Sequence, residues 1–549
     1  MTHEFTLASV FDAMAAAYPD RDAIVFRDRR LSYAAVAERS RRLAHVLADA
    51  GLGARRERDG LDGHESHQDH VGLYLHNGSE YIEGMLAGSA ARVATFNVNY
   101  RYVAEELTYL LRDSDARGLI YHARFAPLLD AIRADLPDLT VLIQVADESG
   151  EALLEGALDY DEALAAADPG PLDRQPSPDD LYILYTGGTT GMPKGVLWRQ
   201  HDIYVAAMGG RPFGSPDVFP DVDAIVAAAA GGGMRAALTP PLMHGAAQWL
   251  TFNTFTGGGA VVIPDDPSRL DAANVWDLVE RERVNIVQIV GDAFARPLID
   301  ELDRRGRDLS SVVAVVNGGA PFTAELKERL LERMPDIMVL DAVGASETGA
   351  QMGQTSTRGT ATTGTFTPGP GAVVVAEDLD RLVEPGSDEL GWLAQQGYVP
   401  LGYLGDAGKT ARTFPVIDGI RHAVPGDRAR WNADGVIELL GRDSVTINSG
   451  GEKIFAEEVE MAIAPHPSVA DVVVTGRPSE RWGSEVVAVV QLVEGTEPDE
   501  EGLLAEATRH IARYKLPKAF VFVDVIVRSP AGKADYRWAR ARAEEAADT

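Results

Sequence analysis

Short apolar runs alternate with longer amphipathic patterns along most of the chain. The runs expected to be strands are residues 23–26, 71–75, 119–121, 141–143, 260–263, 285–290, 312–316 and 337–340. A helix is expected over residues 33–50, because Ser32 is a favoured N-cap residue and Gly51 is favoured just after a helix. This alternation predicts an α/β fold of layered sheets and helices in which the strands are largely buried.

The N-terminal segment shows an apolar residue once per helical turn. Leu7, Val10, Phe11, Met14 and Tyr18 recur at this spacing, and acidic residues stand where an export signal would carry basic ones. An amphipathic helix is therefore expected here rather than a signal peptide. No uncharged run reaches the roughly 18 residues of a membrane span, so we expect a cytoplasmic protein without a membrane segment.

The last part of the chain has a pattern of its own. Helices are expected over residues 457–463 and 501–513, and strands over residues 471–474, 486–492 and 520–527. Helices mixed with a few strands in this order predict a small α+β domain.

Composition narrows the function classes. The chain has 549 residues, of which 45% are hydrophobic, so more than one core can form. A formal net charge of −32 and scattered arginines argue against a nucleic-acid partner. The absence of cysteine excludes disulfides, thiolate metal sites and cysteine nucleophiles. An anionic ligand would need positive groups gathered locally.

Residues 185–195, with the sequence YTGGTTGMPKG, separate two apolar runs. Its four glycines let the backbone N–H groups curl around an anion, and three threonines and a lysine add donors. The Walker motif needs Lys directly after Gly, whereas Pro193 stands between Gly191 and Lys194. The run therefore predicts a phosphate-binding loop of another kind, and a flexible linker between two strands is the alternative.

Residues 55–70 are polar and rich in histidine. His64, Glu65 and His67 invite a metal interpretation, but one residue separates Glu65 from His67 where the zincin pattern has two. We expect a solvated loop here.

Three further stretches carry polar groups on glycine-rich turns. Residues 316–321 end an expected strand in glycines, which permits close approach of a flat ring. Residues 341–349 contain Ser346 and Glu347 and are not a hydrolase elbow, because Thr348 stands where that motif needs glycine. Residues 425–454 contain an Asp on a turn, then an Arg and a Gly-Gly pair.

The run 185–195 closely resembles the signature loop of the adenylate-forming superfamily, which contains acyl-CoA synthetases, luciferases and adenylation domains. The three stretches above and Lys533 near the C-terminus follow in the order that this superfamily has. The runs LLRDSDARGLIYH, PPLMHGAAQW and LGRDSVTINSGGEKIFAEEVE further resemble actinobacterial synthetases that activate fatty acids or steroid side-chain acids. The resemblance implies that a carboxylic acid and ATP form acyl-AMP and pyrophosphate, and that coenzyme A then forms acyl-CoA.

The resemblance also implies residue roles. It assigns catalysis to Lys533, Lys194, Glu347 and His244, and a Mg²⁺ ion to Thr186 and Glu347. The residues that it places around ATP and coenzyme A are Thr186, Gly187, Gly188, Thr189, Thr190, Gly191, Lys194, Gly318, Gly319, Ala320, Ser346, Asp427, Arg442, Gly450, Gly451 and Lys533. A buried structural histidine remains the alternative for His244.

The resemblance divides the chain into an N-terminal adenylation domain, residues 1–441, and a small mobile C-terminal domain, residues 442–549. The chain departs from the family pattern at Gly187, where Ser is usual, and at Ser444, where the hinge usually has Asp or Lys. Val343 replaces an aromatic residue that stacks on adenine, so weaker stacking is expected there.

Two questions stay open in the sequence. An enzyme that passes its acyl-AMP to a carrier protein or another acceptor would share every nucleotide motif. A run of small residues between positions 209 and 237 lines a wide acyl pocket, serves tight helix packing or forms a disordered linker. The oligomeric state is not specified, and a homodimer is one expectation.

Overall fold

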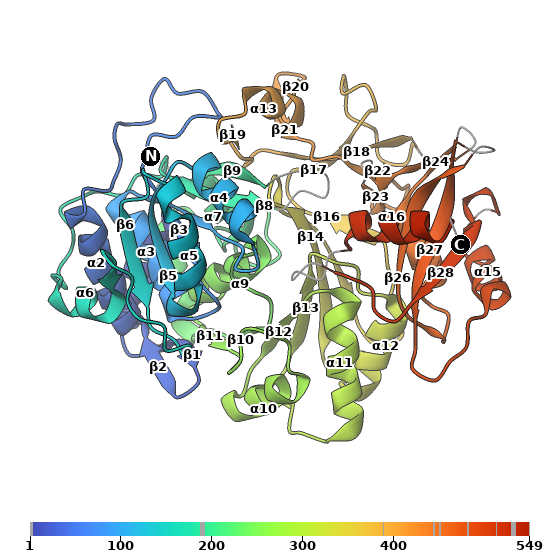
Figure 1. Cartoon of the computed structure of the whole chain (residues 1–549), viewed down its shortest axis with the longest axis horizontal. Helices are drawn as coiled ribbons and strands as arrows, with labels where there is room; N and C mark the ends of the chain where they lie inside the picture. The colour runs from blue at the N-terminus through green and yellow to red at the C-terminus, as the bar shows by residue number, and fades with distance from the viewer. Residues whose placement is uncertain are drawn as a thin grey trace.

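The chain was analysed as a computed structural model that describes residues 4–186, 193–387, 389–442, 445–449, 452–479, 483–511, 513–528 and 534–547. The predicted α/β fold is confirmed, with two large sheets covered by helices and a separate sheet near the C-terminus (Figure 1). No helix among these residues is long and apolar enough to cross a membrane.

An eight-stranded sheet carries the hairpin that brackets the expected phosphate loop. Its interior strands pair in parallel and are almost continuously apolar, as strands covered on both faces must be. The hairpin and one further strand pair antiparallel at one edge. The strand order is β19 (Gly402–Tyr403), β9 (Lys194–Arg199), β8 (Leu181–Thr186), β4 (Ala94–Asn97), β3 (His70–Tyr74), β5 (Ala116–His122), β6 (Val141–Val145) and β7 (Leu158–Asp159).

A second sheet of fifteen strands begins as a parallel sheet and continues as an antiparallel one. The parallel part is β1 (Asp22–Phe26), β11 (Ala260–Ile263), β10 (Arg235–Leu238), β12 (Ile286–Ile289), β13 (Ala314–Gly318) and β14 (Met338–Ala345). Helices α10 (Ala272–Glu282), α11 (Gly291–Arg304) and α12 (Ala324–Arg333) bury their apolar faces in one core with these strands.

The antiparallel part brings distant segments to the end of β14. Its main strands, in order, are β15 (Gly349–Ser356), β16 (Thr365–Pro368), β23 (Ile437–Arg442), β22 (Asp427–Trp431), β18 (Leu390–Gln396), β21 (Ile420–Ala423) and β20 (Val416–Ile417), with β17 (Ala372–Val375) on β18 and β2 (Arg29–Ser32) at the far edge on β1. The turn that carries Asp427 thus lies in the same sheet as the strand that ends near Glu347.

The C-terminal elements form the α+β unit that their pattern predicts (orange to red in Figure 1). The helix expected over 501–513 ends earlier, and so does the strand expected over 520–527. The elements are β24 (Ile447–Ser449), β25 (Glu452–Ile454), α14 (Ala456–Ile463), β26 (Val469–Ser479), β27 (Gly483–Leu492), α15 (Glu500–Thr508), β28 (Ala519–Val523) and α16 (Tyr536–Glu545).

The two helices expected near the N-terminus are confirmed as α1 (Leu7–Ala17) and α2 (Tyr33–Asp49). The hydroxyl of Thr6 accepts a hydrogen bond from the backbone N–H of Ser9 at 3.0 Å, which caps α1. The apolar residues Leu7, Val10, Phe11 and Met14 are buried. The segment is therefore part of the folded core.

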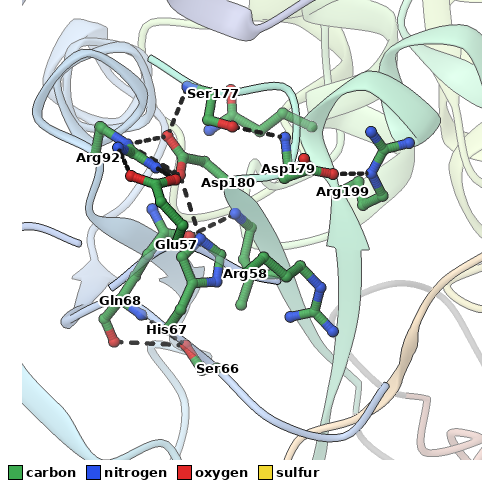
Figure 2. Close-up of polar contacts among 12 residues, drawn as sticks. Glu57, Arg58, Ser66, His67, Gln68, Arg92, Ser177, Asp179, Asp180 and Arg199 are labelled. Atoms are coloured by element: carbon green, nitrogen blue, oxygen red, sulfur yellow. Dashed lines mark hydrogen bonds and ion pairs between the residues drawn. The ribbon is translucent and has the colours of Figure 1, made fainter. Parts of the chain in front are cut away.

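The expectation of a solvated loop at residues 55–70 is wrong for its second half. His67 and Gln68 are buried, and the side-chain oxygen Oε1 of Gln68 accepts a hydrogen bond from the backbone N–H of Leu181, the first residue of β8, at 2.6 Å. Asp180 is also fully buried, and its carboxylate contacts both His67 of this loop and Arg92 (Figure 2). His67 Nε2 lies 3.3 Å from Asp180 Oδ1, and Arg92 Nη2 lies 3.0 Å from the same atom.

Arg92 explains why so polar a loop can be buried. Its guanidinium bridges the Asp180 carboxylate and both carboxylate oxygens of Glu57, at 2.7 and 2.8 Å (Figure 2). Buried charges are tolerated when they are paired and hydrogen-bonded in this way. The loop also contacts the segment after β19, because the backbone N–H of Gly405 donates a hydrogen bond to the His64 carbonyl oxygen at 2.9 Å. The loop therefore joins the start of β8 to the segment after β19.

Candidate active site

Strands β8 and β9 hold the two ends of the expected phosphate loop side by side. Thr186 pairs with Lys194 and Tyr185 pairs with Gly195. A Cβ atom at Gly195 would lie 2.8 Å from Cε2 of the Tyr185 ring, so only glycine lets the ring cross the neighbouring strand there. Gly187, Gly188, Thr189, Thr190 and Gly191 lie outside the described residues.

Lys194 has a carboxylate partner that the sequence reasoning missed. Its ammonium donates to Oδ1 of Asp113 at 3.4 Å, and the Tyr185 and Tyr109 hydroxyls donate to the same carboxylate at 2.9 and 3.1 Å. Asp113 ends helix α4 (Ala104–Asp113). Partial burial acts to lower the pKa of Lys194, but the Asp113 charge and Tyr109 together outweigh it, so the net pKa is raised.

Asp113 is expected to compete with phosphate for Lys194. Both side chains are partly exposed, so the pair is worth about 1 kcal/mol or less, or up to about fivefold in an equilibrium constant. Asp113→Asn keeps the shape of the side chain and one oxygen that accepts a tyrosine hydroxyl, but it removes the charge. Calorimetric titration with ATP is expected to show about two- to fivefold tighter binding.

Asp115→Asn is the matched control, because Asp115 lies two residues away and its carboxylate faces Arg55, 3.6 Å from Nη2. It removes the same charge without touching Lys194 and is expected to leave the ATP affinity nearly unchanged. Weaker ATP binding in Asp113→Asn would show that Asp113 supports Lys194 in the bound state instead.

Ser346 and Glu347 follow directly after β14 and are tied to the eight-stranded sheet. The indole N–H of the buried Trp198 in β9 donates to the Ser346 carbonyl at 2.8 Å. The Tyr403 hydroxyl of β19 donates to Oε1 of Glu347 at 2.6 Å. Ser346 is thereby held by β9, the strand that contains Lys194, and Glu347 by β19, which pairs with β9.

A cavity of about 320 Å³ lies between the two large sheets, within the roughly 300 to 1,000 Å³ typical of small-molecule sites. We call it the His244 cavity. It is lined by apolar side chains that include Met243, Trp249, Leu250 and Val316. The sequence-predicted residues that also line it are Thr186, His244, Gly318, Gly319 and Ser346. His244 stands directly before helix α9 (Gly245–Thr256).

A second cavity adjoins the first, and we call it the Asp427 cavity. The predicted residues Gly319, Ala320 and Asp427 line it, as do Gly441 and residues of the C-terminal unit. Asp427 in β22 stands directly opposite Arg442 in β23, so strand pairing brings these two predicted residues together. Gly319 lines both cavities, as do residues 342–344. The two cavities therefore share a wall.

Val343, which replaces the family's aromatic residue, belongs to this shared wall. Phe366 of β16 also lines the Asp427 cavity and packs in the same apolar cluster as Val343. An aromatic ring is thus present in the cavity although not at the position that the family pattern gives. The sequence analysis missed Phe366, because its link to Val343 runs through the pairing of β15 with β14 and β16.

Three predicted residues of the C-terminal part, Gly450, Gly451 and Lys533, lie outside the described residues. Their neighbours are informative. Arg528 and Ala534 form an isolated antiparallel bridge, and both line the Asp427 cavity. Arg528 and Ala534, which precede and follow Lys533 in the sequence, thus border the cavity that contains Asp427.

The run of small residues between positions 209 and 237 lies away from the His244 cavity. None of its residues, all in the described part of the chain, lines the His244 cavity. A Cβ atom at Gly233 would lie 2.1 Å from the backbone N of Gly259, and Ala236 and Ala237 are buried in β10. At these three positions the small residues serve tight packing, and the hypothesis of an acyl-pocket wall stays a prediction for the rest of the run.

Comparison with known proteins agrees with the motifs. Residues 11–398 match the family model described as AMP-binding enzyme, and residues 458–533 match the AMP-binding enzyme C-terminal domain. The chain belongs to the AMP-binding enzyme family. The predicted resemblance to the adenylate-forming superfamily is thereby confirmed.

Several relatives align with this chain over nearly its whole length. The chain is 58% identical to the medium-chain acyl-CoA ligase Mig of Mycobacterium avium, with 99% of both chains covered. It is 40% identical to a medium/long-chain-fatty-acid–CoA/3-oxocholest-4-en-26-oate–CoA ligase of Mycobacterium marinum, covering 99% of this chain and 98% of the other. It is 38% identical to a 3-oxocholest-4-en-26-oate–CoA ligase of Rhodococcus rhodochrous, covering 95% and 93%.

Solved structures share the fold at lower identity. The anthranilate CoA ligase AuaEII in complex with anthranoyl-AMP superposes with a TM-score of 0.82 at 20% identity, covering 100% of this chain and 99% of the other. ATP-bound MatB from Rhodopseudomonas palustris superposes with a TM-score of 0.78 at 22% identity, covering 99% and 100%. These similarities concern the fold alone.

Proposed function

We propose that this family member is an ATP-dependent carboxylate–CoA ligase whose acid is a medium- or long-chain fatty acid or a steroid side-chain acid. The acid and ATP give acyl-AMP and pyrophosphate, and coenzyme A then displaces AMP to give acyl-CoA. The observation that carries this proposal is the shared wall of the two cavities, because it brings an apolar cavity beside the one that contains Asp427. The activities of the relatives named above support the choice of acid.

Different described residues bind the acid and the ATP during acyl-AMP formation. The apolar His244 cavity takes the acyl chain, with Thr186 and His244 near the reacting carboxylate. Asp427 accepts hydrogen bonds from the ribose hydroxyls, and Phe366 with Val343 contacts the adenine. Lys194 pairs with the polyphosphate, since bringing a carboxylate to a phosphate needs positive charge between the two anions.

A Mg²⁺ ion fits the donor set around Glu347. Magnesium prefers carboxylate and hydroxyl oxygens, and Glu347 supplies the first while Thr186 supplies the second. Tyr403 occupies Oε1 of Glu347, and in the described part of the chain Oε2 makes no hydrogen bond. When bound, the ion would neutralise phosphate charge.

The C-terminal unit completes each half-reaction. We propose residues 442–549 as a mobile domain that rotates between the two steps. Lys533 stabilises the charge on the transferring oxygens in the first step, with Arg442 beside the nucleotide. In the second step the loop at Gly450 and Gly451 lets the pantetheine arm of coenzyme A pass, because glycines leave room for it.

The alternative acceptor is tested by supplying free coenzyme A. A ligase that uses coenzyme A forms acyl-CoA when the acid, ATP and coenzyme A are mixed. An enzyme that serves a carrier protein stops at acyl-AMP in that mixture. Mass spectrometry of the products separates the two functions.

The acid preference is expected to follow buried apolar area. Each additional buried CH₂ is worth about 0.8 kcal/mol, or roughly fourfold in kcat/KM. AMP release with coenzyme A present is therefore expected to rise from short to medium and long chains, and a steroid side-chain acid to be accepted. A dicarboxylic acid of equal length is the matched control, since its second carboxylate resists burial. A preference for acetate or propionate would contradict the choice of acid but leave the ligase assignment intact.

A further inference from the structure

Lys409 lies on the short helix α13 (Ala407–Thr413), which follows β19. Its ammonium nitrogen stands 3.9 Å from the centroid of the Tyr403 ring, which is a cation–π contact. Tyr403 is the residue whose hydroxyl holds Glu347 at 2.6 Å. Lys409 is thus one aromatic ring away from the carboxylate at the centre of the site.

Lys409 carries a positive charge that no acidic side chain of the described residues contacts directly. Among the described residues it forms no ion pair, although its side chain is partly buried. Burial lowers the pKa of Lys409, and the nearby positive charge of Lys194 lowers it further. The negative charges of Glu347 and Asp406 act in the opposite direction, but the net pKa is lowered. A partly buried ammonium with an aromatic face on one side is stabilised by any anion that reaches its other side.

Strand pairing brings the segment that leads to Lys409 next to the strand that contains Lys194. Tyr403 pairs with Val196, and the backbone N–H of Leu404 donates to the Gly195 carbonyl at 2.8 Å. On its other side, β9 pairs with β8, where Thr186 stands opposite Lys194. Lys194 therefore lies between Thr186 and the segment that leads to Lys409. The electrostatic interaction between the two lysines agrees with this arrangement.

We propose that Lys409 is a second phosphate-binding lysine, which contacts the β- or γ-phosphate of ATP and the departing pyrophosphate. The inference rests on the proposed function, since that function supplies the pyrophosphate. In the first step the acid oxygen bonds to the α-phosphorus, and the bond from that phosphorus to the bridging oxygen breaks. The electron pair leaves with pyrophosphate, no proton moves, and the ammonium of Lys409 stabilises the negative charge that departs.

A purely structural role is the competing explanation. Lys409 would then only support Tyr403 and, through it, Glu347. The two roles differ in the second half-reaction, because pyrophosphate has left before coenzyme A attacks. A phosphate-binding residue affects the first half-reaction and pyrophosphate binding, whereas a structural residue also affects folding stability and the second half-reaction.

The test compares Lys409→Gln with Arg412→Gln. Both changes remove one positive charge from α13, but Arg412 is exposed and forms no ion pair with a described residue, so long-range effects are matched. Three quantities are measured on the full chain, namely pyrophosphate affinity by calorimetry, acyl-AMP formation, and acyl-CoA formation from supplied acyl-AMP. Thermal unfolding of each variant checks the fold.

Lys409→Gln is expected to weaken pyrophosphate binding and acyl-AMP formation about 10- to 100-fold, as for one charged hydrogen bond to phosphate. Acyl-CoA formation from acyl-AMP is expected to stay within about twofold, as is every quantity in Arg412→Gln. Lys409→Arg, which keeps the charge, is expected to recover most of the pyrophosphate affinity.

Equal effects of Lys409→Gln and Arg412→Gln would overturn the proposal, and so would a parallel loss of both half-reactions. The calorimetric readout needs no acid. A wild-type chain that binds pyrophosphate but forms no acyl-AMP would therefore count against the proposed function, while the affinity of Lys409→Gln would still decide the role of Lys409.

Discussion

Glu347→Gln is expected to lower kcat/KM for acyl-AMP formation by about 10²- to 10³-fold, the loss typical for one preorganised electrostatic group. Glutamine keeps the shape of the side chain and an oxygen that accepts the Tyr403 hydroxyl. It removes the negative charge that we propose for holding Mg²⁺ beside the phosphates. The loss is therefore expected in the charge-dependent step and not in the local fold, and a pyrophosphate-exchange assay measures it.

Tyr403→Phe is the matched control, because it removes only the hydroxyl that orients Glu347. A drop of about tenfold or less is expected, since the carboxylate and its charge remain. The Mg²⁺ concentration for half-maximal activity is expected to rise in Glu347→Gln and to change little in Tyr403→Phe. An unchanged Mg²⁺ dependence in Glu347→Gln would remove this residue from the metal site.

Lys533→Ala is expected to lower acyl-AMP formation by about 10²- to 10³-fold while sparing acyl-CoA formation from supplied acyl-AMP. The family resemblance gives Lys533 its role, and the position of Arg528 and Ala534 on the Asp427 cavity supports it. Rapid-quench measurement of each half-reaction gives the two rates separately. Equal loss of both would contradict the proposed rotation of residues 442–549.

Gly451→Leu is expected to have the opposite effect, with loss of the second half-reaction and little change in the first. A leucine side chain is expected to block the pantetheine path and to leave pyrophosphate exchange nearly intact. Loss of exchange in this variant would place the loop at Gly450 and Gly451 in the first half-reaction. The two variants together test whether one small domain serves two steps in turn.

Sequence alone identified the parts that depend on local patterns. The alternation of apolar runs and amphipathic helices predicted the α/β fold, and N-cap and glycine signals predicted α2 within one residue of its end. The spacing and composition of residues 185–195 predict an anion-binding loop, and this stays a prediction because residues 187–192 lie outside the described part of the chain.

Predictions of burial from local composition were wrong where burial depends on a residue far away in the sequence. Residues 55–70 are polar, yet His67 in the second half is buried because it pairs with Asp180, whose charge Arg92 neutralises while it also pairs with Glu57. The small residues near Gly233 suggested a cavity wall, whereas they let two backbones approach. The composition of a segment does not specify which distant residues pack against it, and these contacts decide whether the segment is buried.

The partners of Lys194 and Glu347 were decided by tertiary structure alone. Asp113 and Lys194 are 81 positions apart in the chain, and Glu347 and Tyr403 are 56 positions apart. A single aspartate, tyrosine or lysine carries no local signal, since each is common on any surface. The pairing of β19 with β9 brings Tyr403 and Lys409 to the site, and that pairing depends on how the whole sheet assembles rather than on a pattern within either strand.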